Sequence, residues 1–337
     1  LITSVDEISS RRATRHLALL LYSITPLLLK DSHKLKTTMN NIIIGVDLGG
    51  TKIMTGAIDA VDGRVIGTPV KIATQSHLPK EQIVENIAQS IRQVMSANGL
   101  QKQDVVGVGV GSTGPLDLDL GLVLDCPQLP TMQHFALREA LQQAVDLPVA
   151  LNNDANCLVL GEAVFGAARN KRTVLGFTLG TGIGCALVVD GKIWNGATGT
   201  AGEIWCSPHG KGIIEDAISG QGVANIYKQI AHTDASSLEV YQRAQQGERH
   251  ALDAWETFGQ HLAVPLAWCI NLIDPDVVLL GGSIATAHPF FMPAMMRSLH
   301  AHICPLPAQR TSIVMASLAD NAGFVGAACL MRPSSNP

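Results

Sequence analysis

The alternation of apolar and polar positions divides the chain from Asn41 onward into short strands and longer helices. Short apolar runs bounded by turn-forming residues predict strands at 42–47, 53–59, 64–72, 105–111, 149–151, 277–280 and 312–316. Apolar residues at helical spacing predict helices at 80–98, 135–145, 155–168, 221–231, 252–273 and 290–300, a short one after Glu215 and a closing one at 322–331. Strands that alternate with helices predict an α/β fold with a parallel component.

One pattern of strand, Gly/Thr-rich turn and strand occurs twice. Residues 44–59 can be laid over 175–190 at a fixed offset of 131 residues, which aligns Gly49 with Gly180. Two halves that each begin with such a hairpin predict two related domains facing one nucleotide. Gly-rich strands can also produce this likeness by chance, and that alternative stays open.

Composition limits the classes of function. The 337 residues favour two domains, and 47% apolar with 15% charged residues permits a large core and argues against disorder. A net charge of −4 without a long basic run argues against nucleic acid as a partner, because phosphates are neutralised by clustered Lys and Arg. The 7 scattered cysteines form no C-x-x-C pair, which predicts reduced cytoplasmic thiols, no disulfide framework and no thiolate zinc cluster.

Residues 1–38 differ in pattern from the rest of the chain. Three arginines precede an apolar run at 17–29, which is too short to span a bilayer and is followed by no small-residue cleavage site. We expect an extension outside the fold, with a start-site artefact as one explanation and a peripheral amphipathic anchor as the alternative. No membrane span is expected.

Two Gly-rich turns are candidate phosphate sites, because backbone without Cβ atoms lets an anion approach the N–H groups closely. The first turn contains Asp47, Gly49, Gly50, Thr51 and Lys52, and the second contains Gly180, Thr181, Gly182 and Gly184. Thr51 can donate a hydroxyl, and Asp47 can bind Mg²⁺ directly or through water. Ordinary hairpin turns also favour Gly, so the turns alone do not decide the function.

Two further segments carry candidate substrate residues. The formal G-x-G-x-x-G at 109–114 is followed by Pro115 and a second apolar run rather than a helix, which argues against a dinucleotide site. A substrate-facing loop with Ser112, Thr113 and Gly114 is expected instead. Asp154 follows a short strand and is either a helix N-cap or a general base for an attacking hydroxyl. The amide of Asn153 can hold adjacent hydroxyls of a polyol.

Two acids and a Gly pair complete the candidate set. Glu203 and Glu215 flank a polar loop, and carboxylates can accept hydrogen bonds from vicinal sugar hydroxyls. For Glu215 the alternative is an acid that interacts with a helix dipole. Gly281 and Gly282 follow a buried strand at its carboxyl end, where open α/β sheets bind ligands, so they indicate either a nucleoside contact or a tight turn.

These elements in this order resemble the ROK family of sugar kinases and repressors, in the actin/hexokinase-like ATPase superfamily. The resemblance covers about 41–331 and rests on motifs at 47–52, 112–117, 153–154, 180–184, 202–203, 215–220, 274–282 and 321–323. It implies an α/β, two-domain actin-like ATPase (ribonuclease H-like) fold with a cleft between domains. We expect a small N-terminal domain at 39–150 that includes a C-terminal helix at about 318–331, and a large domain at 151–317.

The resemblance also implies residue roles. Asp154 would be the base, Asn153, Glu203 and Glu215 would hold the sugar, the two Gly-rich turns would bind ATP phosphates, and Gly281-Gly282 would meet the adenosine. Three segments depart from the family pattern. Trp205-Cys206 replaces the usual Gly-His, and Gln128 replaces the usual Asn near the sugar. Residues 207–214 replace the usual Cys-rich zinc cluster, so no structural zinc is expected. His209 is a candidate substitute for the missing His.

The sequence therefore predicts a cytoplasmic kinase that transfers phosphate from ATP, with Mg²⁺, to the primary hydroxyl of a hexose or hexose derivative. Glucose is the reference substrate, and N-acetylmannosamine, N-acetylglucosamine, allose and fructose are alternatives. A non-catalytic, sugar-responsive regulator is the alternative from another class, although 1–38 is shorter than the DNA-binding segment of such regulators. A homodimer is expected.

Overall fold

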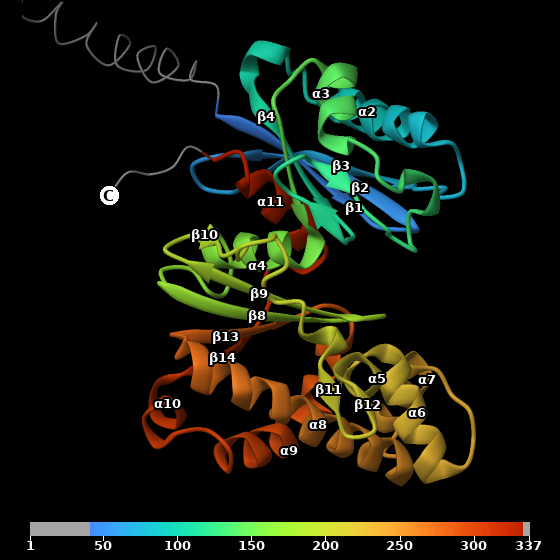
Figure 1. Cartoon of the computed structure of the whole chain (residues 1–337), viewed down its shortest axis with the longest axis vertical. Helices are drawn as coiled ribbons and strands as arrows, with labels where there is room; N and C mark the ends of the chain where they lie inside the picture. Colours follow the sequence, from blue (N-terminus) through green and yellow to red (C-terminus); the bar gives the residue numbers. More distant parts are fainter. Residues whose placement is uncertain (1–40, 333–337) are drawn as a thin grey trace, which may run out of the picture. The chain divides into compact units, whose positions relative to one another are not determined.

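The structure, a computed structural model, describes residues 41–332, so the predictions for 1–38 lie outside the described residues. Its first sheet has the strand order β3-β2-β1-β4-β7 (Figure 1). The strands are β1 (Ile42–Leu48), β2 (Lys52–Asp59), β3 (Val65–Ala73), β4 (Val105–Ser112) and β7 (Val149–Asn153). The first three strands form an antiparallel meander, and β4 and β7 continue the sheet parallel to β1.

A second sheet repeats this topology in the order β10-β9-β8-β13-β14. Its strands are β8 (Thr173–Leu179), β9 (Ile183–Val189), β10 (Lys192–Ile193), β13 (Val277–Gly281) and β14 (Ser312–Met315). Here too an antiparallel meander is followed by two parallel strands. Leu48 pairs with Ile53 across the first turn and Leu179 with Ile183 across the second, so the second turn is one residue shorter. The two predicted hairpins and the α/β class are confirmed.

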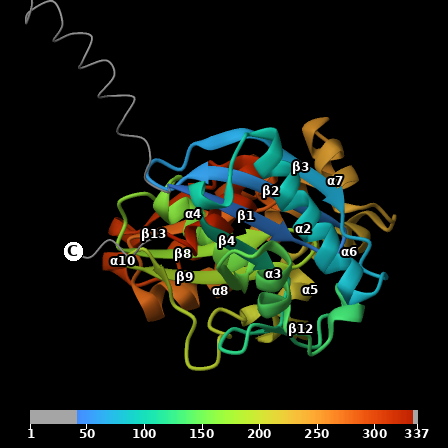
Figure 2. The same ribbon diagram turned by 90° about the horizontal axis from the view of Figure 1, so that it is seen from above.

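One face of the first sheet packs against α2 (Lys80–Ala97) and α3 (Leu137–Val145), as Figure 2 shows. Alternate residues of β1 point to this face, where Ile44 and Val46 are buried with the apolar positions of α2. Ile43 points to the opposite face. The period of two along the strand therefore decides which helices each side chain contacts.

Two helices, α4 (Asp154–Val164) and α11 (Ala322–Cys329), lie between the sheets (Figure 1). α11 packs on β1 and β4, while α4 packs on β8 and β9. The helices approach so closely that a Cβ at Gly326 would lie 1.7 Å from the carbonyl oxygen of Cys157. Only glycine fits at this crossing, so the contact between the elements is set by backbone packing.

The buried carboxylate of Glu162 in α4 also holds the two helices between the sheets together. Glu162 is fully buried, and its oxygens accept hydrogen bonds of 2.7 Å each from the N–H groups of Ser317 and Leu318 and one of 2.8 Å from Ala167 N–H. Buried carboxylates need such partners. Glu162 therefore ties α4 to the segment that leads into α11.

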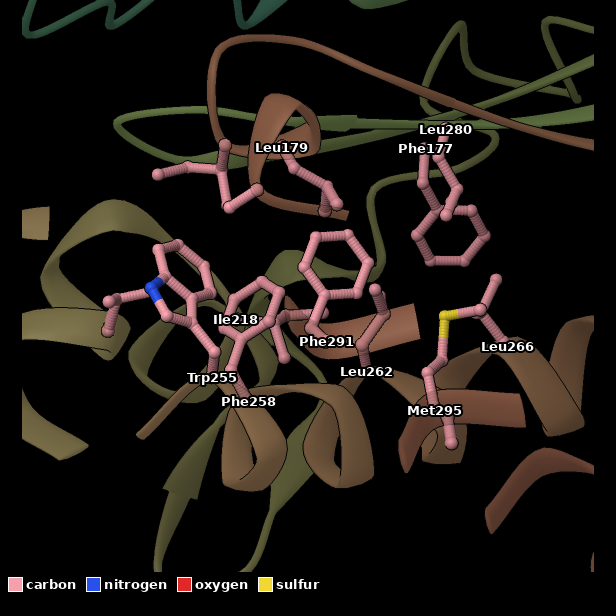
Figure 3. Packing of buried hydrophobic residues seen from close by; sticks show 14 of the residues in the cluster. Phe177, Leu179, Ile218, Trp255, Phe258, Leu262, Leu266, Leu280, Phe291 and Met295 are labelled. Carbon is pink, nitrogen blue, oxygen red and sulfur yellow. The ribbon is translucent and has the colours of Figure 1, made fainter. Parts of the chain in front are cut away.

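The other face of the second sheet carries the largest apolar cluster (Figure 3). This cluster contains Phe177 and Leu280 from the sheet, Phe258 and Leu266 of α8, and Phe291 of α9. The helices on this side are α5 (Ile214–Ile218), α6 (Gly220–Ala231), α7 (Ser237–Gln245), α8 (Arg249–Ile273), α9 (His288–His300) and α10 (Pro305–Arg310). Short hairpins form from β5 (Leu116–Asp117) with β6 (Leu122–Val123), and from β11 (Pro208–His209) with β12 (Gly212–Ile213).

Several helix boundaries differ from the sequence prediction. α3 begins at Leu137 rather than Phe135, because Phe135 forms a β-bridge with Val123. α4 ends at Val164 rather than at residue 168, since Glu162 binds the N–H of Ala167 beyond the helix.

Some elements were not predicted, and one prediction stays open. α7 and α10 are missing from the sequence prediction. The division into domains at residue 150 stays a prediction. Within 41–332, no helix is long and apolar enough to cross a bilayer.

Candidate active site

Three strand ends of the first sheet bring predicted residues together. In the strand register, Asp47 of β1 pairs with Gly111 of β4, which pairs with Asn152 of β7. One residue further, Leu48, Ser112 and Asn153 lie in one row. The carboxyl ends of these parallel strands therefore place the first turn, the 112–114 loop and the start of α4 at one sheet edge.

The start of α4 separates the two interpretations of Asp154. The N-cap is Asn153, whose Oδ1 accepts hydrogen bonds from Ala155 N–H at 2.9 Å and Asn156 N–H at 3.4 Å. Asp154 is the first helical residue, and its Oδ1 accepts a hydrogen bond of 2.7 Å from Ala155 N–H. The N-cap interpretation of Asp154 is therefore wrong. The Nδ2 of Asn153 points toward Gly114, 3.3 Å from where a Cβ would stand.

The electrostatic surroundings of Asp154 suit a base that works near neutral pH. The pKa of its carboxyl group is raised from 3.8 to about 6, mainly by burial and then by the negative charges of Asp47 and Glu203, which together outweigh the lowering effect of the Ala155 N–H. A general base is most effective when its pKa lies near the working pH. Three acids from separate segments, Asp47, Asp154 and Glu203, therefore act on one another at this site.

Asp47 has the surroundings of a cation ligand. Burial raises the pKa of its carboxyl group, and the nearby Lys52 lowers it in part. Gly323 at the start of α11 lies against this side chain, since a Cβ there would stand 2.6 Å from Oδ2. Within 41–332, no three His, Cys, Asp or Glu side chains are grouped as a metal site. One carboxylate beside a Gly-rich turn could hold Mg²⁺, which takes few protein ligands and keeps phosphate and water oxygens.

Helix α4 connects the edge of the first sheet with the second sheet. β9 starts directly against α4, since a Cβ at Gly184 would lie 2.4 Å from Cβ of Ala155. The second Gly-rich turn therefore lies next to the start of α4. Gly281, the last residue of β13, pairs with Thr178 of β8, and Gly282 leaves the strand with a φ of +86° against Leu179. The glycines at 281–282 thus lie on the strand beside the turn.

Glu215 contacts the second turn. Its Oε2 accepts a hydrogen bond of 3.0 Å from the N–H of Ile183. The N–H of Gly220 donates to the carbonyl of Gly180 at 2.8 Å. The sugar contact predicted for Glu215, with a helix-dipole acid as its alternative, stays a prediction, and the structure adds that its Oε2 is engaged with the turn.

Glu203 is hydrogen-bonded to Trp205, one of the residues that depart from the family pattern. Trp205 Nε1 donates a hydrogen bond of 2.6 Å to Glu203 Oε2, and Cys206 Sγ donates to the carbonyl oxygen of Glu203 at 3.5 Å. The side chains of Trp205 and Cys206 are exposed. His209 Nε2 forms a hydrogen bond of 2.9 Å with His261 Nδ1 of α8, so its ring is engaged with that helix.

The remaining predicted residues surround the first turn. A Cβ at Gly50 would lie 2.8 Å from Cβ of Gln128, so Gln128 lies over the turn, and Cys126 Sγ donates to its Oε1 at 3.5 Å. The Ser112 hydroxyl is buried and donates to the carbonyl of Thr113 at 3.0 Å. Thr51 and Lys52 are exposed at the tip.

A cavity of ≈ 390 Å³ lies between α6 and α7. Its lining residues are Gln221, Ala224, Asn225, Lys228, Asp234, Ala235, Ser236 and Glu239. Gly220 precedes this lining and lies between Gly180, the Oγ of Ser237 and Ile284. The cavity therefore begins beside the second turn. Sequence reasoning missed it because α7 was not predicted, although Ser236 and Glu239 form a capping box that marks its start.

Comparisons with known proteins show which family the chain resembles over most of its length. The ROK family profile matches residues 43–334. A glucokinase of Halalkalibacterium halodurans is 27% identical over 87% of this chain and 96% of its own length. An N-acetyl-D-glucosamine kinase of Vibrio cholerae is 30% identical over 85% of this chain and 98% of its own. The crystal structure of a ROK family glucokinase from Streptomyces griseus, in complex with glucose and AMPPNP, matches with a TM-score of 0.73 at 27% identity, covering 86% of this chain and 98% of that one.

Proposed function

The chain belongs to the ROK family, and from this premise we propose that it is an ATP-dependent kinase for a hexose or hexose derivative. The reaction transfers the γ-phosphoryl group of ATP to the primary hydroxyl of the sugar. The observation that carries the proposal is the position of Asp154. Its carboxylate stands at the edge of the first sheet, next to both Gly-rich turns, with its pKa raised to about 6, mainly by burial.

Asp154 accepts the proton of the attacking hydroxyl in this proposal. The sugar oxygen forms a bond to the γ-phosphorus, the bond from that phosphorus to the bridging oxygen breaks, and ADP leaves with the electron pair. The Asp154 oxygen that is not bonded to Ala155 N–H is available for the proton. Catalysis then depends mainly on positioning and electrostatics.

The two turns bind the phosphates in this proposal. The N–H groups of Gly49, Gly180 and Ile183 already donate to protein acceptors, so those of Gly50, Thr51, Thr181 and Gly182 are the ones proposed to face the ATP oxygens. The Thr51 hydroxyl and Lys52 ammonium stand at the exposed tip of the first turn. Mg²⁺, when bound, shields the phosphate charge, and Asp47 is the residue that would hold it, directly or through water. The nucleoside extends past Gly281-Gly282 toward the cavity that begins beside Gly220.

The sugar lies between Asp154 and the segment around Glu203. Asn153 Nδ2 is a donor for sugar hydroxyls, and Glu203 and Glu215 are acceptors, each with one oxygen already engaged. The 112–114 loop, Gln128 and Cys206 line the same region as proposed sugar contacts. Glucose and N-acetylglucosamine are the first substrates to test, because the relatives named above are kinases of these sugars.

The proposal includes two further expectations. Closure of a domain at 39–150 with the helix at about 318–331 against one at 151–317 would exclude water from the transfer. We also expect a homodimer in the cytoplasm, where ATP is abundant.

ADP release in a coupled assay tests the function across glucose, mannose, fructose, allose, N-acetylglucosamine and N-acetylmannosamine. We expect sugar-dependent release with at least one sugar, and a fall in kcat of on the order of 100-fold or more for Asp154→Asn. No release with any sugar would instead favour the regulator, for which salt-dependent binding to DNA is the corresponding assay.

A further inference from the structure

One short segment holds the second Gly-rich turn on both sides. The N–H of Gly220 donates to the carbonyl of Gly180 at 2.8 Å, and Glu215 Oε2 accepts from the N–H of Ile183 at 3.0 Å. A Cβ at Gly182 would stand 2.4 Å from Glu215 Oε2, so the carboxylate lies directly against the turn. The turn residues between these two contacts therefore have their backbone fixed from outside the hairpin.

The carboxylate of Glu215 is not needed by its own helix. At the start of α5 it is Asp216 that serves the helix, because Asp216 Oδ2 accepts a hydrogen bond of 3.0 Å from Ile213 N–H. Glu215 is half-buried and reaches across to β9 instead. Two adjacent acids thus have different partners, and the alternative of a helix-dipole acid describes Asp216 better than Glu215.

A carboxylate with one engaged oxygen can still accept another hydrogen bond. Oε2 of Glu215 binds Ile183 N–H, whereas Oε1 lies 3.9 Å from the Gly182 Cβ position. Each oxygen carries two lone pairs, so Oε1 remains able to accept a hydroxyl. The same side chain can therefore contact a sugar and the phosphate turn at once.

We propose that Glu215 is a positioning residue for the 180–184 turn and couples sugar binding to nucleotide binding. The coupling rests on the proposed function, because it requires a sugar hydroxyl on Oε1. A sugar that orders Glu215 also orders the turn, so sugar tightens nucleotide binding, and by linkage nucleotide tightens sugar binding by the same factor.

Hydrogen exchange tests the positioning role without any reaction. In Glu215→Ala the Ile183 amide loses its acceptor, so we expect its exchange to be faster than in the unmodified protein. Glu215→Gln keeps an acceptor oxygen at this position, and exchange should stay near the original rate. Asp216→Asn, the adjacent control, should leave the Ile183 amide unchanged.

Calorimetric titration with Mg²⁺ and the non-hydrolysable analogue AMPPNP tests the consequence. Without sugar, Glu215→Ala should bind the analogue about fivefold more weakly, the scale of one lost hydrogen bond, while Glu215→Gln and Asp216→Asn stay within about twofold. A saturating sugar substrate should tighten analogue binding in the unmodified protein but not in Glu215→Ala. A purely sugar-binding role predicts unchanged sugar-free affinity in Glu215→Ala, and that result would overturn the inference.

Failure of the proposed function gives a different result. In that case the unmodified protein phosphorylates no sugar, whereas the exchange rates of Ile183 still report whether Glu215 holds the turn. Unchanged Ile183 exchange in Glu215→Ala, with phosphorylation intact in the unmodified protein, rejects the positioning role alone.

Discussion

Replacing Asp154 by Asn should stabilise the protein while it removes the activity. The folded state raises the pKa of Asp154 from 3.8 to about 6, so it disfavours the ionised carboxylate. The unfolded chain carries the same carboxylate in water at its ordinary pKa. Ionisation of Asp154 therefore opposes folding, and an uncharged amide of the same shape removes that opposition.

The size of the effect follows from linkage. A pKa difference of one unit corresponds to about 1.4 kcal/mol, so raising the pKa from 3.8 to about 6 costs the folded state at most about 3 kcal/mol once both states are ionised. For a raised carboxyl pKa this cost is fully present above about pH 6 and is lost as the pH falls to about 4. At pH 5 it is about half as large.

Urea unfolding at pH 8 and pH 5 measures this cost. Asp154→Asn should unfold with a free energy up to about 3 kcal/mol larger at pH 8, and the gain should be about half as large at pH 5. Asp146→Asn is the matched control, since Asp146 is exposed and pairs with Lys102 at 2.7 Å. An Asp154→Asn protein that is no more stable at pH 8, or equally stabilised at both pH values, would show that ionisation of Asp154 does not oppose folding.

Three further predictions test other parts of the structure. The kcat/KM for the sugar should fall about tenfold per pH unit below about pH 6, because Asp154 must be deprotonated to act as base; a profile that stays flat to pH 4.5 would contradict this. Glu162→Gln should lower the free energy of unfolding by about 2–3 kcal/mol, since its amide NH₂ would face backbone donors, while the exposed Glu85→Gln should change it little. Trp205→Phe keeps an aromatic ring but loses the donor to Glu203, so it should change the KM for sugar severalfold and leave the KM for ATP unchanged; an altered KM for ATP alone would contradict the placement of Glu203 at the sugar.

The hairpins and the strand ends were predictable from the sequence because their signals are local. Two runs of strand-forming apolar residues joined by a Gly/Thr-rich turn specify β1–β2 and β8–β9 without reference to the rest of the chain. Parallel strands also align their carboxyl ends, and the strand register of the structure brings residues 47, 112 and 153 to one edge. The ROK family assignment from these motifs agrees with the family profile over 43–334.

Contacts between distant segments were not predictable. The partner of Glu215 is a backbone N–H 32 residues earlier, and the bond from Trp205 to Glu203 depends on a short 3-10 turn with no periodic pattern. Nor does any local signal pair His209 with His261, which lies 52 residues away. α7 was not predicted for another reason. Its N-terminal capping box can be recognised in the sequence, but its apolar residues show only weak helical spacing.

Identification of the product by NMR tests whether Asp154 activates the primary hydroxyl of the sugar. The protein is incubated with Mg-ATP and the sugar that gives the highest turnover, and the phosphorus of the product is correlated with the sugar protons. We expect a phosphate coupled to the two protons of the primary carbon with the unmodified protein, and at least 100-fold slower formation with Asp154→Asn. A phosphate at another carbon, or equal rates for the two proteins, would contradict the assignment of Asp154 as base for the primary hydroxyl.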